Sequence, residues 1–176
     1  GDFEPPKYYN SPETPLYRKT RGLYGLSHAR TDMAATGEVL ICEGYTDVMA
    51  LHQAGFGNAV ATCGTAVGAE HFRLLSRYVN RVVLAFDSDA AGAKAAERAW
   101  EQAREVDTEA RSAGSGAAFS IRVLVLPDGA DPAEYVQTEG AEALRAAIDD
   151  PTPVVPFLLH SHLSLADTST ETGRTD

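Results

Sequence analysis

Acidic side chains follow three separate apolar runs of this chain, and they are its most informative feature. Glu43 follows the first run, Asp87 and Asp89 follow the second, and Asp128 and Asp131 follow the third. If these runs are neighbouring parallel strands, their carboxyl ends lie side by side, where α/β sheets place ligands. Carboxylates gathered there repel one another unless cations lie between them, and hard oxygen ligands suit Mg²⁺ or Mn²⁺. The pattern therefore indicates a metal-dependent phosphoryl-transfer site.

Each of these motifs also has a purely structural interpretation. An Asp-x-Asp pair after a strand is often only a turn and a helix cap. Asp131 followed by Pro132 is typical of an N-cap with proline at the first helical position. Asp47 is predicted to cap or brace the helix that follows Glu43. The functional interpretation depends on all three motifs occurring in order at strand ends.

Short apolar runs alternate with segments of helical periodicity, which predicts an α/β fold. The expected sheet is mostly parallel with helices on both faces, and an extended N-terminal segment and a short C-terminal helical segment flank it. Ser27 is the expected N-cap of the first helix, and Gly37 is expected to end it. The expected strands are 38–42, 58–62, 81–86 and 119–126, and the expected helices are 28–35, 45–54, 69–79, 90–106, 132–138, 141–149 and 153–165.

The chain divides into one main domain with flanking segments. At 176 residues and 44% hydrophobic, it is long enough to bury a sizeable core. We expect a basic extended lead-in at 1–30, the α/β domain at 31–150, the start of a C-terminal helical subdomain at 151–165, and a disordered tail or linker at 166–176.

The charge balance is uneven along the sequence. A net charge of −10 argues against a generic nucleic-acid coat, which would be basic, yet residues 1–30 hold five basic and three acidic side chains. An acidic centre with a basic flank suits metal ions that bridge carboxylates to a polyphosphate, although on charge alone an ordinary acidic protein surface is the favoured interpretation. No membrane-spanning run or signal peptide is present. Cys42 and Cys63 lack the histidine spacing of a zinc site, so reduced buried thiols are expected.

The three acidic motifs resemble those of the TOPRIM (Rossmann-like) fold of topoisomerases and primases. They are Glu43-Gly44-Tyr45-x-Asp47, Asp87-Ser88-Asp89-x-Ala91-Gly92 and Asp128-Gly129-x-Asp131-Pro132. The segment 7–19, followed by Leu23-Tyr24-Gly25-Leu26, is similar to the segment that leads into TOPRIM in bacterial DnaG-type DNA primases. The resemblance covers about residues 7 to 160.

This resemblance implies that short RNA primers are synthesised on single-stranded DNA from NTPs, with two or more Mg²⁺ or Mn²⁺ ions. Glu43, Asp87 and Asp89 are the implied catalytic residues and metal ligands, with Glu43 acting as a ligand or as a proton shuttle. Asp131 and Asp128 complete the expected metal set.

The resemblance also implies a nucleotide and nucleic-acid surface. Lys7 and Lys19 match lysines that the family uses near the active site, and Tyr8, Asn10 and Arg18 accompany them. Separately, the backbone amides around Gly64 and Thr65 are candidates for binding a triphosphate. Solvated charge in a flexible entry segment is the alternative for the basic residues. His28, His52 and His71 lie in expected helices and are interpreted as structural.

The implied partners are single-stranded DNA, NTPs and the RNA primer, in the bacterial cytoplasm at replication forks. Contacts with a replicative helicase and a single-strand-binding protein would use parts of a full-length primase that this sequence lacks. This sequence shows no counterpart of three parts of a complete primase: the zinc-binding domain, the helicase-binding domain and the upstream half of the polymerase domain. We therefore expect weak or no priming by this chain alone.

Two other functional classes remain open from the sequence. One is a TOPRIM nuclease or topoisomerase fragment that uses the same metals to break phosphodiester bonds. The other is a non-catalytic TOPRIM interaction module. Inhibition by a guanosine polyphosphate that competes with NTP is a further hypothesis about regulation.

Overall fold

The computed structural model describes residues 12–14, 18–62, 64–86, 90–114 and 118–165. Within them, five strands form one sheet in the order β2-β1-β3-β4-β5. The pairs β1–β2, β1–β3 and β3–β4 are parallel, and β4–β5 is antiparallel. The mostly parallel α/β sheet predicted from the sequence is therefore confirmed. The strands are β1 (Glu38–Cys42), β2 (Ala59–Ala61), β3 (Arg81–Ala85), β4 (Ser120–Val123) and β5 (Thr152–Pro153).

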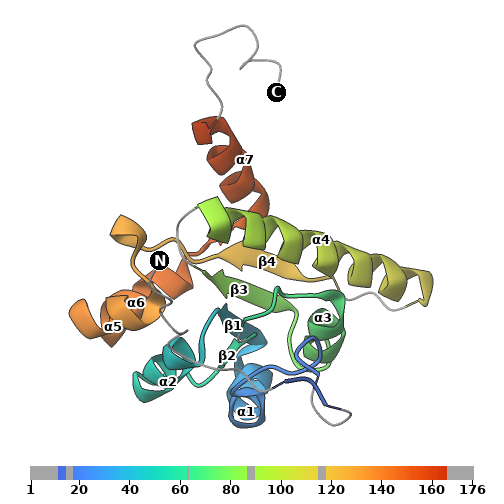
Figure 1. The fold of residues 1–176 in the computed structure, drawn as a ribbon, viewed down its shortest axis with the longest axis horizontal. Coiled ribbons are helices and arrows are strands. Elements are labelled where there is room, and N and C mark those ends of the chain that lie inside the picture. The colour runs from blue at the N-terminus through green and yellow to red at the C-terminus, as the bar shows by residue number, and fades with distance from the viewer. Residues whose placement is uncertain (1–11, 15–17, 63, 87–89, 115–117, 166–176) are drawn as a thin grey trace, which may run out of the picture.

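Helices cover both faces of this sheet (Figure 1). The helices are α1 (Leu26–Thr36), α2 (Tyr45–Gln53), α3 (Ala69–Leu75), α4 (Ala90–Ser112), α5 (Pro132–Thr138), α6 (Ala141–Asp149) and α7 (Val154–Leu165). Helices α1, α3, α4 and α7 pack on one face, and α2, α5 and α6 pack on the other. None of the described helices has the length and apolar composition needed to cross a bilayer.

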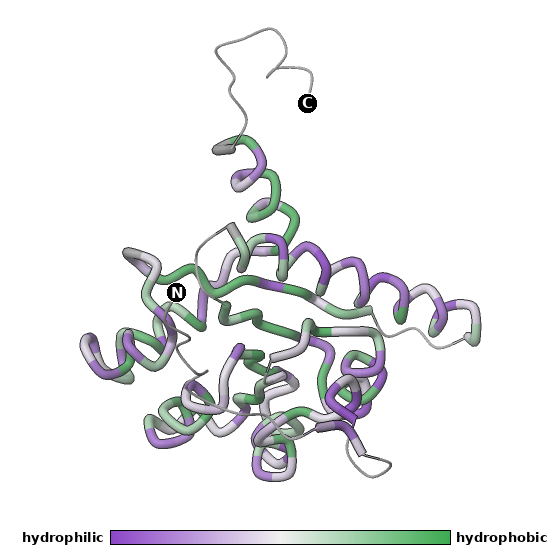
Figure 2. The backbone as a smooth tube through the Cα atoms, in the orientation of Figure 1, coloured by the Kyte–Doolittle hydropathy of each residue, from purple (hydrophilic) through white to green (hydrophobic). Residues whose placement is uncertain are grey.

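Side-chain alternation along the strands produces these two apolar layers. In β1, Val39 and Ile41 join the layer under α1, α3 and α4, whereas Leu40 and Cys42 join the layer under α2 and α6. All four are at most 1% exposed, because a parallel sheet is buried on both sides. Figure 2 shows the strands as mainly hydrophobic and much of α4 as hydrophilic, as expected of a helix with one face in water.

The element boundaries depart from the sequence prediction in identifiable places. Helix α3 ends at Leu75 rather than at residue 79, and α4 continues to Ser112 rather than stopping at residue 106. The antiparallel strand β5 was not predicted, because two residues are too few to give a periodic pattern. Ser27 as the first N-cap was wrong, because α1 begins earlier and Gly25 caps it. Gly37 ends α1 as predicted, with φ 69° and its N–H on the Met33 carbonyl.

The lead-in joins the sheet through an isolated bridge. Tyr24 donates its N–H to the Ala61 carbonyl (2.8 Å) and accepts from the Ala61 N–H (3.1 Å). Gly25 follows with φ 81°, and a Cβ there would lie 2.9 Å from the Val48 side chain. Glycine is therefore required where the lead-in turns into α1 against α2 and β2.

Phe72 tests the packing of α3 on the sheet. Its ring is fully buried and meets Phe119 edge-to-face, with 5.3 Å between centroids. We expect Phe72→Ala to lower the free energy of unfolding by about 3–5 kcal/mol in urea titration, because a large cavity replaces the ring. Leu159→Ala is the control, since Leu159 is 61% exposed and its truncation should change stability little. Equal effects of the two changes would contradict this assignment of the core.

Candidate functional site

A cleft of about 570 Å³ opens beyond the carboxyl ends of β1, β2 and β3. Its volume is in the range of small-molecule sites, and its position is the one at which α/β sheets bind ligands. The lining residues come from the segments that follow these strands and from the starts of α2, α4 and α5. They are Glu43, Gly44, Asp47, Thr62, Gly64, Thr65, Ala66, Val67, Phe86, Ala91, Ala95 and Asp131.

The end of β1 supplies two of the carboxylates in the cleft. Glu43 comes directly after β1 and is exposed, and Asp47 lies in the first turn of α2. Asp47 Oδ2 accepts the Gly44 N–H at 3.1 Å, which satisfies a backbone donor at the helix N-terminus. The prediction that Asp47 braces this helix is therefore confirmed, and its charge also lies in the cleft.

Asp131 supplies a third carboxylate from the start of α5. It is the N-cap of that helix, Pro132 occupies the first helical position, and Oδ1 accepts the Glu134 N–H at 2.6 Å. The structural interpretation of this motif is therefore correct, and Asp131 lines the cleft as well. Asp128 lies in the 3-10 turn η1 (Pro127–Gly129), and its side chain is outside the described part of the structure.

The loop after β2 also lines the cleft, and we call residues 62–67 the cleft loop. Gly64 has φ 88°, a backbone conformation that favours glycine. The Thr65 hydroxyl donates to the Thr62 carbonyl at 3.2 Å and closes the turn. Both residues proposed to present backbone amides, Gly64 and Thr65, therefore lie in the cleft wall. Cys63 lies outside the described residues.

The buried thiol of Cys42 reports the electrostatics of this site. Burial raises the pKa of Cys42 well above its ordinary value, and the negative charges of Asp47, Asp131 and Glu43 raise it further. Three carboxylates from two segments of the chain are thus close enough to act on one buried atom. Their oxygen atoms are the donors that Mg²⁺ and Mn²⁺ prefer, so the residues present fit a hard divalent cation.

The described residues do not by themselves complete a metal site. Within the part of the chain that the structure describes, no group of three or more His, Cys, Asp or Glu side chains is arranged to hold a metal ion. Asp87 and Asp89, the first-choice ligands, lie outside the described residues. Phe86 and Ala91, on either side of them, both line the cleft.

Among the residues predicted to bind nucleotide or nucleic acid, Lys7, Tyr8 and Asn10 lie outside the described part. Arg18 and Lys19 lie in a tight turn whose Arg18 carbonyl accepts the N–H groups of Arg21 (3.0 Å) and Gly22 (3.1 Å). Neither Arg18 nor Lys19 is among the cleft-lining residues. The predicted role of Arg18 and Lys19 beside the carboxylates therefore stays a prediction.

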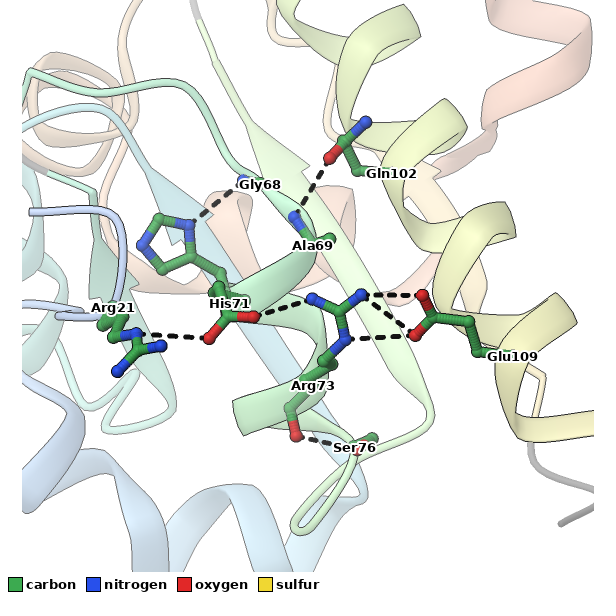
Figure 3. A network of polar contacts seen from close by, with 9 residues as sticks. Arg21, Gly68, Ala69, His71, Arg73, Ser76, Gln102 and Glu109 are labelled. Atoms are coloured by element: carbon green, nitrogen blue, oxygen red, sulfur yellow. Dashed lines mark hydrogen bonds and ion pairs between the residues drawn. The ribbon is translucent and has the colours of Figure 1, made fainter. Parts of the chain in front are cut away.

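A polar network attaches this turn to α3 and α4 (Figure 3). Glu70 pairs with Arg21 (3.3 Å) and with Arg73 (2.7 Å), and Arg73 also pairs with Glu109 of α4 (2.8 Å). His71 faces the Lys19 carbonyl at 3.3 Å through Nε2. Sequence reasoning placed His71 in a helix with a structural role but missed this link. The spacing Gly68-x-x-His71, from N-cap to third helical position, signals the cap at Gly68 but not the contact with Lys19.

Comparisons with known proteins agree with this geometry. The Toprim-like family matches residues 40–136. The chain is 43% identical over 169 residues to the DNA primase of Escherichia coli K12, covering 96% of this chain and 28% of that protein. The E. coli primase catalytic core superposes with a TM-score of 0.77 at 42% identity, covering 97% of this chain and 52% of that one.

A DnaG primase catalytic domain bound to single-stranded DNA is equally similar. Its TM-score is 0.77 at 41% identity, covering 97% of this chain and 51% of that one. The chain therefore spans about a quarter of the length of the curated primases that it matches and about half of the solved catalytic domains.

The buried His71 makes the stability of this chain dependent on pH. Burial lowers the pKa of His71 below the ordinary 6.5, so the unfolded chain binds a proton that the folded chain resists. The contribution of neutral His71 to the free energy of unfolding should therefore be complete above pH 6.5. It should fall as the pH drops through that value towards the lower pKa of His71 in the folded chain. We expect parent and His71→Asn to differ less in unfolding free energy at about pH 5 than at about pH 7.5. Urea titrations at both pH values measure this difference, and a pH-independent difference would contradict a neutral buried imidazole.

Proposed function

This chain belongs to the Toprim-like family, and from that premise we propose that it is the metal-binding catalytic part of a DNA primase. The reaction is nucleotidyl transfer, in which a hydroxyl attacks the α-phosphate of an NTP and pyrophosphate leaves, to make RNA primers on single-stranded DNA. The observation that carries this proposal is the convergence of Glu43, Asp47 and Asp131 in one cleft beyond the strand ends.

The donor set supports a divalent cation, Mg²⁺ or Mn²⁺, with two or more ions in the complete site. When bound, such ions neutralise phosphate charge and stabilise both the attacking and the leaving oxygens. Glu43 offers an exposed carboxylate at the end of β1. Asp131 offers a carboxylate whose position is fixed by the hydrogen bond to Glu134. Asp47 already holds the Gly44 N–H, so it contributes negative charge and orients the turn beside Glu43.

Asp87 and Asp89 belong to the same proposed centre, with Asp128 as a further candidate. Four residues separate Phe86 from Ala91, and both of these line the cleft. A stretch this short spans at most about 15–18 Å between its ends, so chain connectivity supports carboxylates close to the cleft. We assign Asp87 and Asp89 as metal ligands, and Glu43 as a ligand or proton shuttle.

Substrate binding is assigned to the cleft loop and the lead-in. Gly64 and Thr65 would present backbone amides to the triphosphate, and lysine and arginine side chains of the lead-in would bind phosphates of the NTP or template. The solved relative bound to single-stranded DNA supports DNA as the template. In this assignment the lead-in contributes Lys7, Tyr8, Asn10, Arg18 and Lys19.

The remaining assignments concern the longer protein. We propose that residues 1–30 are the lead-in from an upstream polymerase subdomain, 31–150 the TOPRIM domain, 151–165 the start of a helical subdomain, and 166–176 a linker. Helicase and single-strand-binding protein would contact other parts of a primase acting at bacterial replication forks. This chain alone should therefore prime weakly, because it matches only 28% of the length of the E. coli primase.

Metal binding is the first test of the proposed centre. We expect saturable Mn²⁺ binding by calorimetry in the parent chain, weakened at least about tenfold in Asp87→Ala/Asp89→Ala because two oxygen ligands are lost. Asp149→Ala/Asp150→Ala is the matched control, since it removes the same charge from two exposed residues that do not line the cleft. Equal loss in both double variants would indicate only a general charge effect and would contradict the assignment.

Asp131 allows its capping role to be separated from its proposed metal role. Asp131→Ala should lower the unfolding free energy by about 1 kcal/mol, whereas Asp131→Asn keeps a capping oxygen and should be nearly neutral. Both variants should weaken Mn²⁺ binding, because both remove the negative charge. Urea titration and Mn²⁺ calorimetry on the two variants measure these effects. Unchanged Mn²⁺ affinity in Asp131→Asn would exclude Asp131 from the metal centre.

A further inference from the structure

His71 connects the cleft loop to the turn of the lead-in that holds Arg18 and Lys19, which we call the basic turn. Its ring is fully buried, and both nitrogens face backbone groups. Nδ1 accepts the Gly68 N–H at 3.1 Å, and Gly68 directly follows the cleft loop. Nε2 faces the Lys19 carbonyl at 3.3 Å, 52 residues away in sequence. One imidazole therefore joins two segments that the proposed function assigns to phosphate binding.

These contacts require one tautomer of the imidazole. Because Nδ1 accepts a hydrogen bond from an amide, it carries no proton, and the ring proton must be on Nε2. Nε2 can then donate to the Lys19 carbonyl, and burial keeps the ring neutral by lowering the pKa of His71. Lysine or arginine could not replace it here, because neither side chain accepts a hydrogen bond.

The lead-in also holds the opposite end of the cleft loop. Tyr24 forms its two backbone hydrogen bonds with Ala61, the residue immediately before Thr62. The cleft loop is thus attached at its start through Ala61 and at its end through Gly68 and His71. The lead-in residues Lys19 and Tyr24 provide both attachments, so the lead-in contacts the segments on both sides of the cleft loop.

Helix α3, which carries His71, is itself fixed to α4. The Ala69 N–H donates to Gln102 Oε1 at 3.1 Å, and Arg73 reaches Glu109 through Nε (3.1 Å) and Nη2 (2.8 Å) (Figure 3). The basic turn is therefore linked through α3 to α4, and the first turns of α4, at Ala91 and Ala95, also line the cleft.

We propose that His71 is a positioning residue that sets the basic turn of Arg18 and Lys19 against the cleft loop for binding nucleotide phosphates. The proposal rests on the proposed function and adds a residue that touches neither metal nor substrate. Its neutral imidazole holds the two parts of the phosphate-binding surface at a fixed separation. Loss of the Lys19 link should weaken nucleotide binding while leaving Mn²⁺ binding to the carboxylates unchanged.

Two substitutions separate the two hydrogen bonds of the imidazole. His71→Asn places an amide oxygen where Nδ1 lies, so the Gly68 cap is retained and the Lys19 link is lost. His71→Gln extends an amide nitrogen towards the Nε2 position and can restore that link. His52→Asn is the matched control, because His52 Nε2 lies 2.9 Å from the Ala59 carbonyl, a partner in β2 rather than in the lead-in.

Trypsin measures the attachment of the turn without depending on any ligand. We expect His71→Asn to be cleaved at least about fivefold faster after Arg18, Lys19 and Arg21 than the parent, because local opening exposes that backbone. Cleavage after Arg30, in α1, serves as an internal reference. Parent, His71→Gln and His52→Asn should be cleaved slowly after the same three residues. Equal rates in parent and His71→Asn would overturn the proposal.

Calorimetry with Mn²⁺ alone and with ATP plus Mn²⁺ tests the functional part. We expect about tenfold weaker ATP binding in His71→Asn, unchanged Mn²⁺ affinity, and partial recovery in His71→Gln. Faster cleavage with unchanged ATP affinity would reduce His71 to a structural role and overturn the proposal. Failure of the parent to bind Mn²⁺ would instead contradict the proposed metal centre, and the cleavage rates would still decide whether His71 holds the lead-in.

Discussion

The register between β1 and its two parallel neighbours is the constraint on which the site depends. Cys42, the last residue of β1, lies opposite Ala61 of β2 and opposite Ala85 of β3. Glu43, Thr62 and Phe86 therefore leave the sheet from one common row. The side chains of β1 alternate between the two apolar layers, and this fixes the register, because a shift by one residue would exchange the side chains that pack in each layer. An ion pair between Glu38 and Arg81, directly opposite at the other end (2.7 Å), holds the same register. Packing in the core thus determines where the carboxylates meet.

The acidic residues at this row serve the backbone and the cleft together. Asp47 accepts the Gly44 N–H and Asp131 accepts the Glu134 N–H, so each carboxylate satisfies a backbone donor at a helix N-terminus and also lines the cleft. Placing like charges close together costs free energy; the same carboxylates add to the effect of burial in raising the pKa of the Cys42 thiol. Hydrogen bonds to helix N-termini offset part of this repulsion, because the positive end of each helix dipole favours a negative charge. A cation would offset the remainder.

Local patterns predicted most of the fold, and the failures have physical causes. Strands β1 and β3 were located from continuous apolar runs, and helices α5 and α6 from the segments between turn signals, which depend on neighbouring residues only. Helix α3 was predicted too long because Val79 continues its apolar spacing, although it is buried in the turn before β3. The convergence of Glu43 and Asp131 was predicted because parallel strands bring their carboxyl ends together. The contact between His71 and Lys19 was not, since it joins a side chain to a carbonyl 52 residues away.

Two kinds of contact attach the lead-in to α3, an exposed ion pair and the hydrogen bond of a buried ring. The ion pair of Arg21 with Glu70 is the more conspicuous, yet these side chains are 62% and 44% exposed, so water and salt screen it. The His71 ring is fully buried and its hydrogen bonds join neutral groups, so salt screens them far less than it screens the ion pair. An uncharged contact of a buried ring therefore holds the backbone of the turn that carries the basic side chains of Arg18 and Lys19.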